Sequence, residues 1–354
     1  MKALILAGGK GTRLRPITFS MAKQLVPVAN KPVIEYGIEA IAAAGVKDFG
    51  IIVADTQKAI EEVVGDGSKF GINVTYIPQM DPLGLAHAVA TAKDFLGDDD
   101  FIMYLGDNMI KSSLSDLVNE FKDPSVAATI LLTPVPNPSD FGVAELTDGK
   151  VTSLREKPKD PKSNLALVGV YLFRSSIHDH IARLKPSPRG EFEITDAIQS
   201  LVDAGLNVHS HIVDGWWKDT GTVEAMLEAN RLILEDMPRD IQGDVDEHSK
   251  IEGRVCLAAG AKVVNSVIRG PVIIGANCRI ENSYVGPFTA IDAGTLVKDA
   301  EIEYSIVLQD CELIRPGARI EASLIGRGSK VSHAESLPKT MQLVLGDSSQ
   351  ITLP

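Results

Sequence analysis

A glycine-rich turn near the start of the chain has the residue types needed to hold phosphate groups. The residues Leu6-Ala-Gly8-Gly9-Lys10-Gly11-Thr12-Arg13-Leu14-Arg15-Pro16 follow an apolar run that predicts a buried strand. Glycines lack a Cβ, so backbone N–H groups can approach phosphate oxygens closely, while Lys10, Arg13 and Arg15 add charged donors. The spacing matches neither the P-loop nor the dinucleotide-binding pattern, and the glycines alone could equally form a tight structural turn.

Two later acidic residues have the chemistry to hold a divalent cation on those phosphates. Asp107 closes the apolar run that begins at Phe101, and Asp219 stands between aromatic residues and Thr220-Gly221. Mg²⁺ bound to phosphates takes a small number of carboxylate ligands. Each residue also has a purely structural interpretation, because Asp107 could form a turn and Asp219 could cap a helix.

A third group of residues could hold a phosphorylated sugar. Glu156-Lys157-Pro158 follows a predicted strand, so Glu156 could accept hydroxyl groups and Lys157 could pair with a phosphate, although Lys-Pro is also a common exposed turn. Glycines at Gly142 and Gly169, the latter after Val168, would allow backbone contacts.

The pattern of elements predicts how these residues are positioned. Short apolar runs alternate with helical patterns as far as about residue 236, which is typical of a doubly wound α/β domain with a mostly parallel sheet. Predicted strands are 2–7, 49–54, 74–78, 101–105, 127–132, 167–173 and 208–213; predicted helices are 32–44, 57–64, 84–96, 193–204 and 223–235. Ligands bind at the carboxyl ends of such strands, so the loops after residues 7, 78, 105 and 173 are expected to form the site.

The C-terminal part of the chain has a different periodicity. Apolar residues recur at steps of six, six and five, which gives a 17-residue period. The positions are Ile251, Leu257, Val263, Ile268, Ile274, Ile280, Val285, Ile291, Val297 and Ile302. Three short steps per coil predict a parallel β-helix, with a β-sandwich as the alternative. We place the domain boundary between residues 240 and 241, giving domains 1–240 and 241–354. The stretch from Glu335 to Pro354 loses the repeat, and we expect it either to cap the last coil or to fold over it.

Composition and charge exclude several classes of protein. A formal net charge of -12 disfavours nucleic-acid binding, and no apolar run is long enough to span a membrane. The three cysteines have no paired spacing, which favours reduced thiols in a cytoplasmic protein over a disulfide framework or a zinc site. The β-helix flank offers a surface for a homo-oligomer, but the sequence does not specify one.

Several motifs together resemble the nucleotide-sugar pyrophosphorylase family. The first turn is followed by Lys23-Gln24-Leu-Val-Pro27 and then by Lys31-Pro32. Further matching blocks are Gln79-Met-Asp-Pro82-Leu-Gly84, Gly106-Asp107-Asn108, Phe141-Gly142-Val143, Glu156-Lys157-Pro158, Gly190–Asp196 and Trp217–Gly221. Within the family the blocks look most like glucose-1-phosphate thymidylyltransferases, and the repeats resemble the left-handed β-helix of their long form. The resemblance covers the whole first domain.

The resemblance implies a role for each candidate residue. It implies dTTP, glucose 1-phosphate and Mg²⁺ as the reactants and cofactor, with Asp107 and Asp219 as metal ligands and Arg13, Lys23 and Lys157 as catalytic residues. The nucleotide would contact Leu6, Gly8, Gly9, Gly11, Thr12, Gln24, Gln79 and Gly84; the sugar phosphate would contact Gly142, Glu156, Lys157, Val168 and Gly169. Short-form relatives usually carry Tyr where this chain has Phe141, so one hydroxyl contact is absent.

The expected reaction is an in-line attack of the sugar phosphate on the α-phosphorus with release of pyrophosphate. Such a step needs positioning and charge neutralisation, and it needs no covalent nucleophile. Three alternatives stay open: another nucleotide or sugar phosphate, an added acetyltransferase activity in the β-helix, and a non-catalytic regulatory subunit. The second is disfavoured because the repeats carry histidines only at their edge, His248, and at their end, His333.

Overall fold

The computed structural model describes residues 1–333 and 341–353 and contains two compact units. The first comprises Met1–Lys10, Met21–Leu25 and Val33–Asp219, and the second comprises Gly11–Ser20, Val26–Pro32 and Thr220–Pro354. Two short N-terminal segments and the helix α8 (Val223–Asp236) therefore group with the C-terminal repeats. The boundary at residue 240 stays a prediction.

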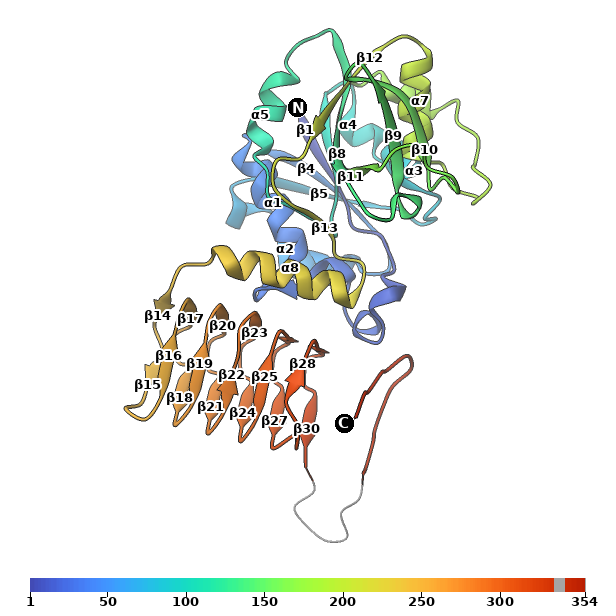
Figure 1. The fold of residues 1–354 in the computed structure, drawn as a ribbon. Helices are drawn as coiled ribbons and strands as arrows, with labels where there is room; N and C mark the ends of the chain where they lie inside the picture. Colours follow the sequence, from blue (N-terminus) through green and yellow to red (C-terminus); the bar gives the residue numbers. More distant parts are fainter. Residues whose placement is uncertain (334–340, 354) are drawn as a thin grey trace. The chain divides into compact units, whose positions relative to one another are not determined.

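A mixed sheet forms the centre of the first unit (Figure 1). Its strands run in the order β10-β9-β11-β6-β1-β4-β5, and β8 joins β11 to β12. The bounds are β1 Lys2–Leu6, β4 Asp48–Val53, β5 Asn73–Pro78, β6 Phe101–Leu105, β8 Val126–Pro134, β9 Gly142–Thr147, β10 Lys150–Glu156, β11 Leu165–Phe173 and β12 Asn207–Ile212. Strands β1, β4, β5 and β6 are parallel, so their carboxyl ends meet at one edge.

Helices cover both faces of this sheet, as expected for a doubly wound domain. Alternate residues of β1 point to opposite faces: Ile5 belongs to one apolar cluster and Leu4 to the other. The first cluster contains α1 (Val33–Ala43), α2 (Gln57–Val64) and α5 (Leu114–Glu120). The second contains α3 (Leu85–Thr91), α4 (Lys93–Leu96), α6 (Ile177–Ile181) and α7 (Ile194–Asp203). Both faces of the sheet are therefore buried.

The sheet is less parallel than the sequence pattern indicates. Strand β11 runs antiparallel to β6, and β9 pairs antiparallel with both β10 and β11. The hairpin of β9 and β10 was not predicted, because its residues mix polar and apolar side chains without a continuous apolar run. A small two-stranded sheet pairs β7 (Asn108–Ile110) with β13 (Trp217–Asp219), and it brings two candidate blocks together.

The repeats form a left-handed parallel β-helix whose register confirms the 17-residue period (Figure 1). Ile251, Ile268, Val285 and Ile302 occupy matching positions on successive coils of one sheet. The first sheet of the β-helix contains β14 Asp240–Ile241, β17 Val255–Leu257, β20 Val272–Ile274, β23 Thr289–Ile291, β26 Ile306–Val307 and β29 Leu324–Ile325. The second contains β15 Asp244–Val245, β18 Lys262–Val264, β21 Arg279–Glu281, β24 Leu296–Lys298, β27 Glu312–Ile314 and β30 Lys330–Ser332. The third contains β16 Lys250–Glu252, β19 Val267–Arg269, β22 Tyr284–Val285, β25 Glu301–Glu303 and β28 Ile320–Glu321. Stacking buries the apolar row that one coil could not bury alone.

Asn230 joins three segments of the second unit. Its side chain is fully buried in α8, where Oδ1 accepts a hydrogen bond from the Ala29 N–H at 2.9 Å. Its Nδ2 donates to the Phe288 carbonyl of the β-helix, also at 2.9 Å. The hairpin of β2 (Pro27–Val28) and β3 (Lys31–Pro32) makes a second contact, since Asn30 Nδ2 donates to the Ile291 carbonyl at 2.8 Å.

We expect Asn230→Leu to destabilise this unit. The substitution leaves the Ala29 N–H and the Phe288 carbonyl without their partner, and each unmade buried hydrogen bond costs about 1–3 kcal/mol. The urea midpoint of unfolding should fall clearly below that of the unchanged protein. Asn119→Leu, an exposed asparagine in the first unit, is the control and should leave the midpoint nearly unchanged. Equal midpoints for both variants would contradict this role of Asn230.

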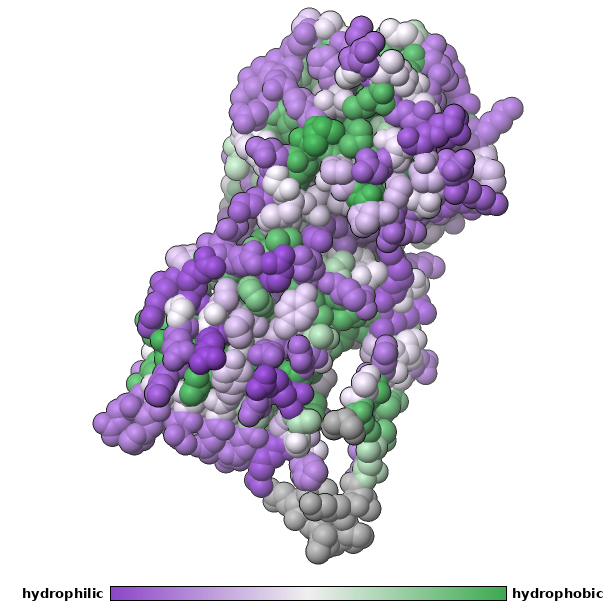
Figure 2. Space-filling view, viewed as in Figure 1, coloured by the Kyte–Doolittle hydropathy of each residue, from purple (hydrophilic) through white to green (hydrophobic). Residues whose placement is uncertain are grey.

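The C-terminal stretch was predicted to cap the last coil of the β-helix or to fold over it, but part of it, residues 335–340 and 354, lies outside the described residues. Residues 341–353 form neither helix nor strand. They expose several apolar side chains, among them Met341 and Val344, and part of this segment is green, the hydrophobic colour, in Figure 2. Among the described residues, no helix is both long and apolar enough to cross a membrane.

Candidate active site

The predicted nucleotide-binding residues of the first unit lie at the carboxyl edge of the parallel strands. Leu6 ends β1, Gln79 follows β5, and Asp107 follows β6 after Gly106. The Gly106 N–H donates to the Leu6 carbonyl at 3.0 Å, and the Gln79 N–H donates to the Val53 carbonyl at 2.8 Å. These bonds extend the strand ladder by one step, so the backbone at this edge is held firmly.

Gly9 leaves room for a lysine that reaches the candidate metal ligand. A Cβ at Gly9 would lie 2.9 Å from the Lys23 Cε, closer than real Cβ contacts. The Lys23 ammonium forms an ion pair with the Asp107 carboxylate, and both side chains are largely buried. The structure thus brings together Gly9, Lys23 and Asp107, three residues from separate sequence blocks. Lys23 is placed where it could also pair with a phosphate bound beside Asp107.

Gln24 has a buried polar side chain beside Gly9 and Gly106. The side chain is 1% exposed, and its Oε1 has no hydrogen-bond partner among the described residues. The Gln24 Cγ and Nε2 lie near the positions that side chains on Gly106 and Gly9 would occupy. An unmade buried acceptor is costly, so a ligand donor at this point would be favourable. This supports the predicted contact of Gln24 with the nucleotide.

Gly11, Thr12 and Arg13 belong to the segment Gly11–Ser20, which groups with the second unit. Gly11 adopts a left-handed conformation with φ 61°, and a short 3-10 helix, Thr12–Leu14, follows it. The Gly11 carbonyl accepts a hydrogen bond from the Thr18 Oγ1 at 2.7 Å, which closes the loop on itself. This loop directly follows Gly8 and Gly9 in the sequence. The nucleotide contact of Thr12 and the catalytic role of Arg13 stay predictions.

The two candidate metal ligands lie at one end of a two-stranded sheet, since Asp107 immediately precedes β7 and Asp219 is the last residue of β13. Strands β7 and β13 are antiparallel with Asp219 opposite Asn108, so Asp219 faces the residue that follows Asp107. Asn108 is buried; its Nδ2 donates to the Asp107 Oδ1 at 3.0 Å, and its Oδ1 accepts from the Trp217 Nε1 at 2.6 Å. Among the described residues, no group of three or more His, Cys, Asp or Glu could hold a metal ion. Two carboxylates completed by phosphate and water oxygens suit Mg²⁺.

An irregularity in strand β11 brings the backbone of Gly169 close to Leu105 and Asn108. The register of β11 against β8 shifts between Leu167 and Tyr171, and Gly169 has φ 75° there. A Cβ at Gly169 would lie 2.8 Å from the Leu105 Cδ1 and 3.0 Å from the Asn108 Oδ1. Only glycine fits this approach, and such bulges often turn backbone groups towards a site. Val168 has no exposed surface in this structure, and its predicted contact with the sugar phosphate stays a prediction.

The predicted sugar residues Gly142 and Glu156 lie opposite each other on β9 and β10. A Cβ at Gly142 would lie 3.0 Å from the Glu156 Oε2 and 2.6 Å from the Thr195 Cγ2. The Glu156 Oε2 accepts from the Thr195 Oγ1 at 3.4 Å, and the Arg189 guanidinium lies 3.3 Å from the Glu156 Oε1. Burial, assisted by the neighbouring charge of Glu193, raises the pKa of Glu156 above its usual range.

Lys157 holds an unusual backbone conformation next to Glu156. Its φ is 42°, in the left-handed region that a residue with a Cβ seldom adopts, and its N–H donates to the Phe141 carbonyl at 2.9 Å. Strained residues of this kind often occur at binding sites. The Phe141 ring packs edge-on against Trp217 with ring centroids 5.4 Å apart, so this side chain contributes an apolar ring and no hydroxyl.

The raised pKa of Glu156 predicts a pH-dependent sugar affinity. An ionised carboxylate accepts sugar hydroxyls more strongly than the protonated group does, and Glu156 protonates at a higher pH than an ordinary glutamate. As pH falls, the KM for the sugar phosphate should rise, and the rise should begin at a higher pH than for an exposed glutamate. In Glu156→Gln this acidic rise should be absent, with a KM that is higher at neutral pH. If the variant kept the acidic rise, another group would be responsible.

The structure adds residues that the sequence motifs did not single out. Asn108 links Asp107 to Trp217, Thr195 donates to Glu156, and His87 contacts Gln79. The motif blocks contain Asn108 and Thr195, but their partners are distant in the sequence, so spacing carried no signal of these contacts.

The chain is similar to several known proteins. Residues 2–236 match the model of the Nucleotidyl transferase family. A glucose-1-phosphate thymidylyltransferase of Streptomyces griseus is 57% identical over 99% of this chain and 99% of its own length. One of Streptomyces antibioticus is 55% identical over 100% of this chain and 99% of its own length. A solved structure from Bacillus anthracis, described as a glucose-1-phosphate thymidylyltransferase in complex with a sucrose, superposes with a TM-score of 0.63 and 37% identity over 68% of this chain and 97% of that chain.

The chain is an enzyme of the nucleotidyl transferase class, because the family match covers 235 of 354 residues, from 2 to 236, and the two Streptomyces enzymes match it over nearly its full length. It belongs to the Nucleotidyl transferase family. The similarity to the two Streptomyces proteins extends through the β-helix as well.

Proposed function

We propose that this enzyme joins dTTP to α-D-glucose 1-phosphate, forming dTDP-glucose and pyrophosphate. The observation that carries the proposal is the 57% identity, over nearly the full length of both chains, to a glucose-1-phosphate thymidylyltransferase. The convergence of Gly9, Lys23, Asp107 and Gln79 at one sheet edge supports it. Three cysteines without a disulfide among the described residues suit a cytoplasmic enzyme.

The proposed chemical step uses the residues that the sequence motifs single out. The sugar phosphate would lie beside Lys157 with its hydroxyls on Glu156, and its oxygen would attack the α-phosphorus as pyrophosphate leaves. Lys23 and Arg13 would neutralise the charge that builds up on the phosphates, and the glycine turn would hold them in line. Asp107 and Asp219 would hold Mg²⁺, which supplies further neutralisation of the phosphate oxygens.

A panel of triphosphates tests the proposal. The purified protein with Mg²⁺ and glucose 1-phosphate should release pyrophosphate with dTTP at a kcat/KM about tenfold or more above that with UTP, GTP or ATP. A different preferred triphosphate would keep the nucleotidyltransferase class and overturn the choice of dTTP. Absence of pyrophosphate with every triphosphate would favour the non-catalytic regulatory subunit.

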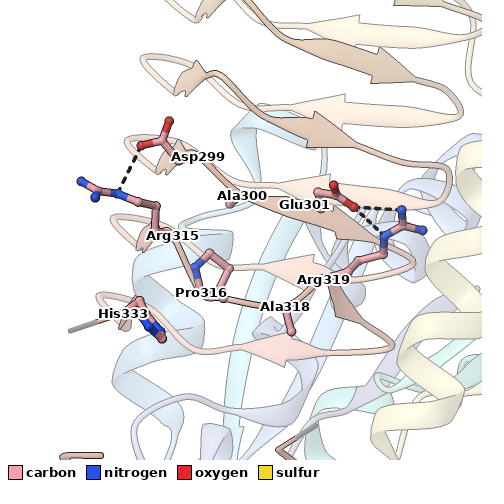
Figure 3. Close-up of a pocket in the computed structure, with 9 residues that line it drawn as sticks. Asp299, Ala300, Glu301, Arg315, Pro316, Ala318, Arg319 and His333 are labelled. Carbon is pink, nitrogen blue, oxygen red and sulfur yellow. Dashed lines mark hydrogen bonds and ion pairs between the residues drawn. The ribbon is translucent and has the colours of Figure 1, made fainter. Parts of the chain in front are cut away.

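The β-helix pocket shown in Figure 3 bears on the acetyltransferase alternative. His333 lines this pocket together with Arg315 and Arg319. Each arginine faces a carboxylate of the preceding coil: the Arg315 Nε lies 3.3 Å from Asp299, and the Arg319 Nη2 lies 2.9 Å from Glu301. Because these charges are already compensated within the β-helix, we expect acetyl transfer to glucosamine 1-phosphate to stay at background. Acetylation above background would add this second activity to the enzyme.

A further inference from the structure

The Nε2 end of the Gln79 amide is hydrogen-bonded to a protein side chain, whereas within the described part of the chain the Oε1 end is not. The side chain is only 6% exposed, and its Nε2 lies 2.9 Å from the Nδ1 of His87. The Gln79 Oε1 lies 3.7 Å from the point that a Cβ on Gly8 would occupy, so the oxygen points over the start of the glycine turn. Among the described residues this oxygen accepts no hydrogen bond from the protein. It is available to a donor on a bound ligand.

His87 is itself held in place by neighbouring packing. It lies on α3, and its ring stacks on Phe192 with centroids 6.3 Å apart and planes 26° apart. The Phe192 backbone clamps the start of that helix, since its N–H donates to the Leu83 carbonyl and its carbonyl accepts from the Ala86 N–H. Gly84, at φ 108°, permits this approach, because a Cβ there would lie 2.5 Å from the Phe192 oxygen.

The orientation of the Gln79 amide in the structure sets the direction of this hydrogen bond. With its NH₂ group against Nδ1 of His87, the amide donates, and the neutral imidazole then carries its proton on Nε2. In this arrangement the Gln79 Oε1 faces the ligand as an acceptor. A thymine or uracil base presents an N3–H donor, whereas cytosine presents an acceptor at N3. To bind cytosine, Gln79 would have to turn over and His87 would have to move its proton from Nε2 to Nδ1, so both partners of the pair would have to change.

We propose that His87 is a positioning residue for base selection: its Nδ1 holds the Gln79 amide with the oxygen towards a pyrimidine that carries an N3–H. This inference rests on the proposed function, in which Gln79 contacts the base of dTTP. His87 touches neither the phosphates nor the sugar in this scheme. Its removal should therefore alter the choice of base and the affinity for dTTP, and leave the use of the sugar phosphate unchanged.

The first test compares dTTP with dCTP in His87 variants of the full-length chain. His87→Phe keeps a ring on Phe192 and removes the acceptor; the KM for dTTP should rise about tenfold, which corresponds to the loss of one oriented hydrogen bond. The kcat/KM ratio of dTTP over dCTP should fall by a similar factor, with the KM for glucose 1-phosphate unchanged within about twofold. In His87→Asn the Oδ1 replaces Nδ1 as acceptor, and the ratio should recover to within about threefold of the original.

A matched control separates this role from general packing. His180 lies on α6 of the same unit, and its Nδ1 lies 2.7 Å from the Ser200 Oγ, so His180→Phe removes a comparable hydrogen bond elsewhere. It should leave the dTTP to dCTP ratio unchanged. In a Gln79→Leu background, His87→Phe should change the KM for dTTP by less than about twofold, because the two residues act through one contact.

The outcomes distinguish the inference from the function on which it rests. If the unchanged enzyme fails to use dTTP, the proposed function is wrong. The inference about His87 is then overturned as well, and this result requires no variant. If it prefers dTTP and His87→Phe keeps the original ratio, the inference alone is overturned. A full effect of His87→Phe in the Gln79→Leu background would also overturn it, and so would failure of His87→Asn to restore selectivity when a melting curve shows it folded.

Discussion

Asp107→Asn and Asp219→Asn are each expected to lower kcat by about 10²- to 10³-fold, with little change in stability. Each substitution removes one negative charge from the pair that we propose as the Mg²⁺ site, while the amide keeps the size of the side chain. Asn108 can still hydrogen-bond to an amide at position 107, so the local packing should persist. The measurement is initial pyrophosphate release at saturating substrates, with a thermal melting curve for each variant.

Asp98→Asn is the matched control for this prediction. Asp98 precedes β6 at its amino end and is exposed, whereas Asp107 follows the carboxyl end of the same strand. The control should retain the original kcat. Higher Mg²⁺ concentrations should restore part of the lost activity in the Asp107 and Asp219 variants, because weaker metal binding can be offset by mass action. Near-normal turnover in either variant would remove that residue from the metal site.

Gly84→Ala is expected to cost about 2–4 kcal/mol of folding free energy and to raise the KM for dTTP. The new Cβ would lie 2.5 Å from the Phe192 oxygen and 2.8 Å from the Phe192 nitrogen, and the backbone at φ 108° is unsuited to alanine. Either the start of α3 or the Phe192 segment must move, which displaces His87 and, through it, the Gln79 amide. Urea unfolding and dTTP kinetics together measure both effects.

Gly97→Ala separates the clash at Gly84 from backbone strain alone. Gly97 follows α4 with φ 58°, and a Cβ there would meet nothing within 4 Å. With ψ at -135°, Gly97 lies outside the left-handed helical region, so this control should cost about 1–3 kcal/mol from backbone strain, and it should leave the KM for dTTP unchanged. If both variants lost the same stability and neither changed the kinetics, the close approach of Phe192 to Gly84 would have no part in nucleotide binding.

The fold could be predicted from the sequence wherever apolar residues recur at a regular spacing or form a continuous run. The β-helix is the clearest case, since Ile251, Ile268 and Val285 recur every 17 residues and stack in register. The parallel strands of the first unit were predicted because burial on both faces makes them continuous apolar runs. The β9–β10 hairpin has no such run, and the grouping of Gly11–Ser20 with the second unit depends on tertiary contacts that no local pattern encodes.

The candidate site was predictable to the extent that its residues follow strand ends. Gln79 and Asp107 could be placed at one edge from the strand pattern alone, and the structure confirms that placement. The partners of these residues could not be predicted: Asn108 reaches Trp217 across 109 residues, and His87 meets Gln79 only because a helix begins between them. Sequence spacing identifies strand-end residues, while hydrogen-bond geometry depends on how the elements pack.

The most direct test of the account is the product stoichiometry of the unchanged enzyme with dTTP, glucose 1-phosphate and Mg²⁺. The account predicts equal amounts of pyrophosphate and dTDP-glucose, with neither product formed when glucose 1-phosphate is left out. Pyrophosphate release without dTDP-glucose, or no release of pyrophosphate from dTTP at all, would contradict it.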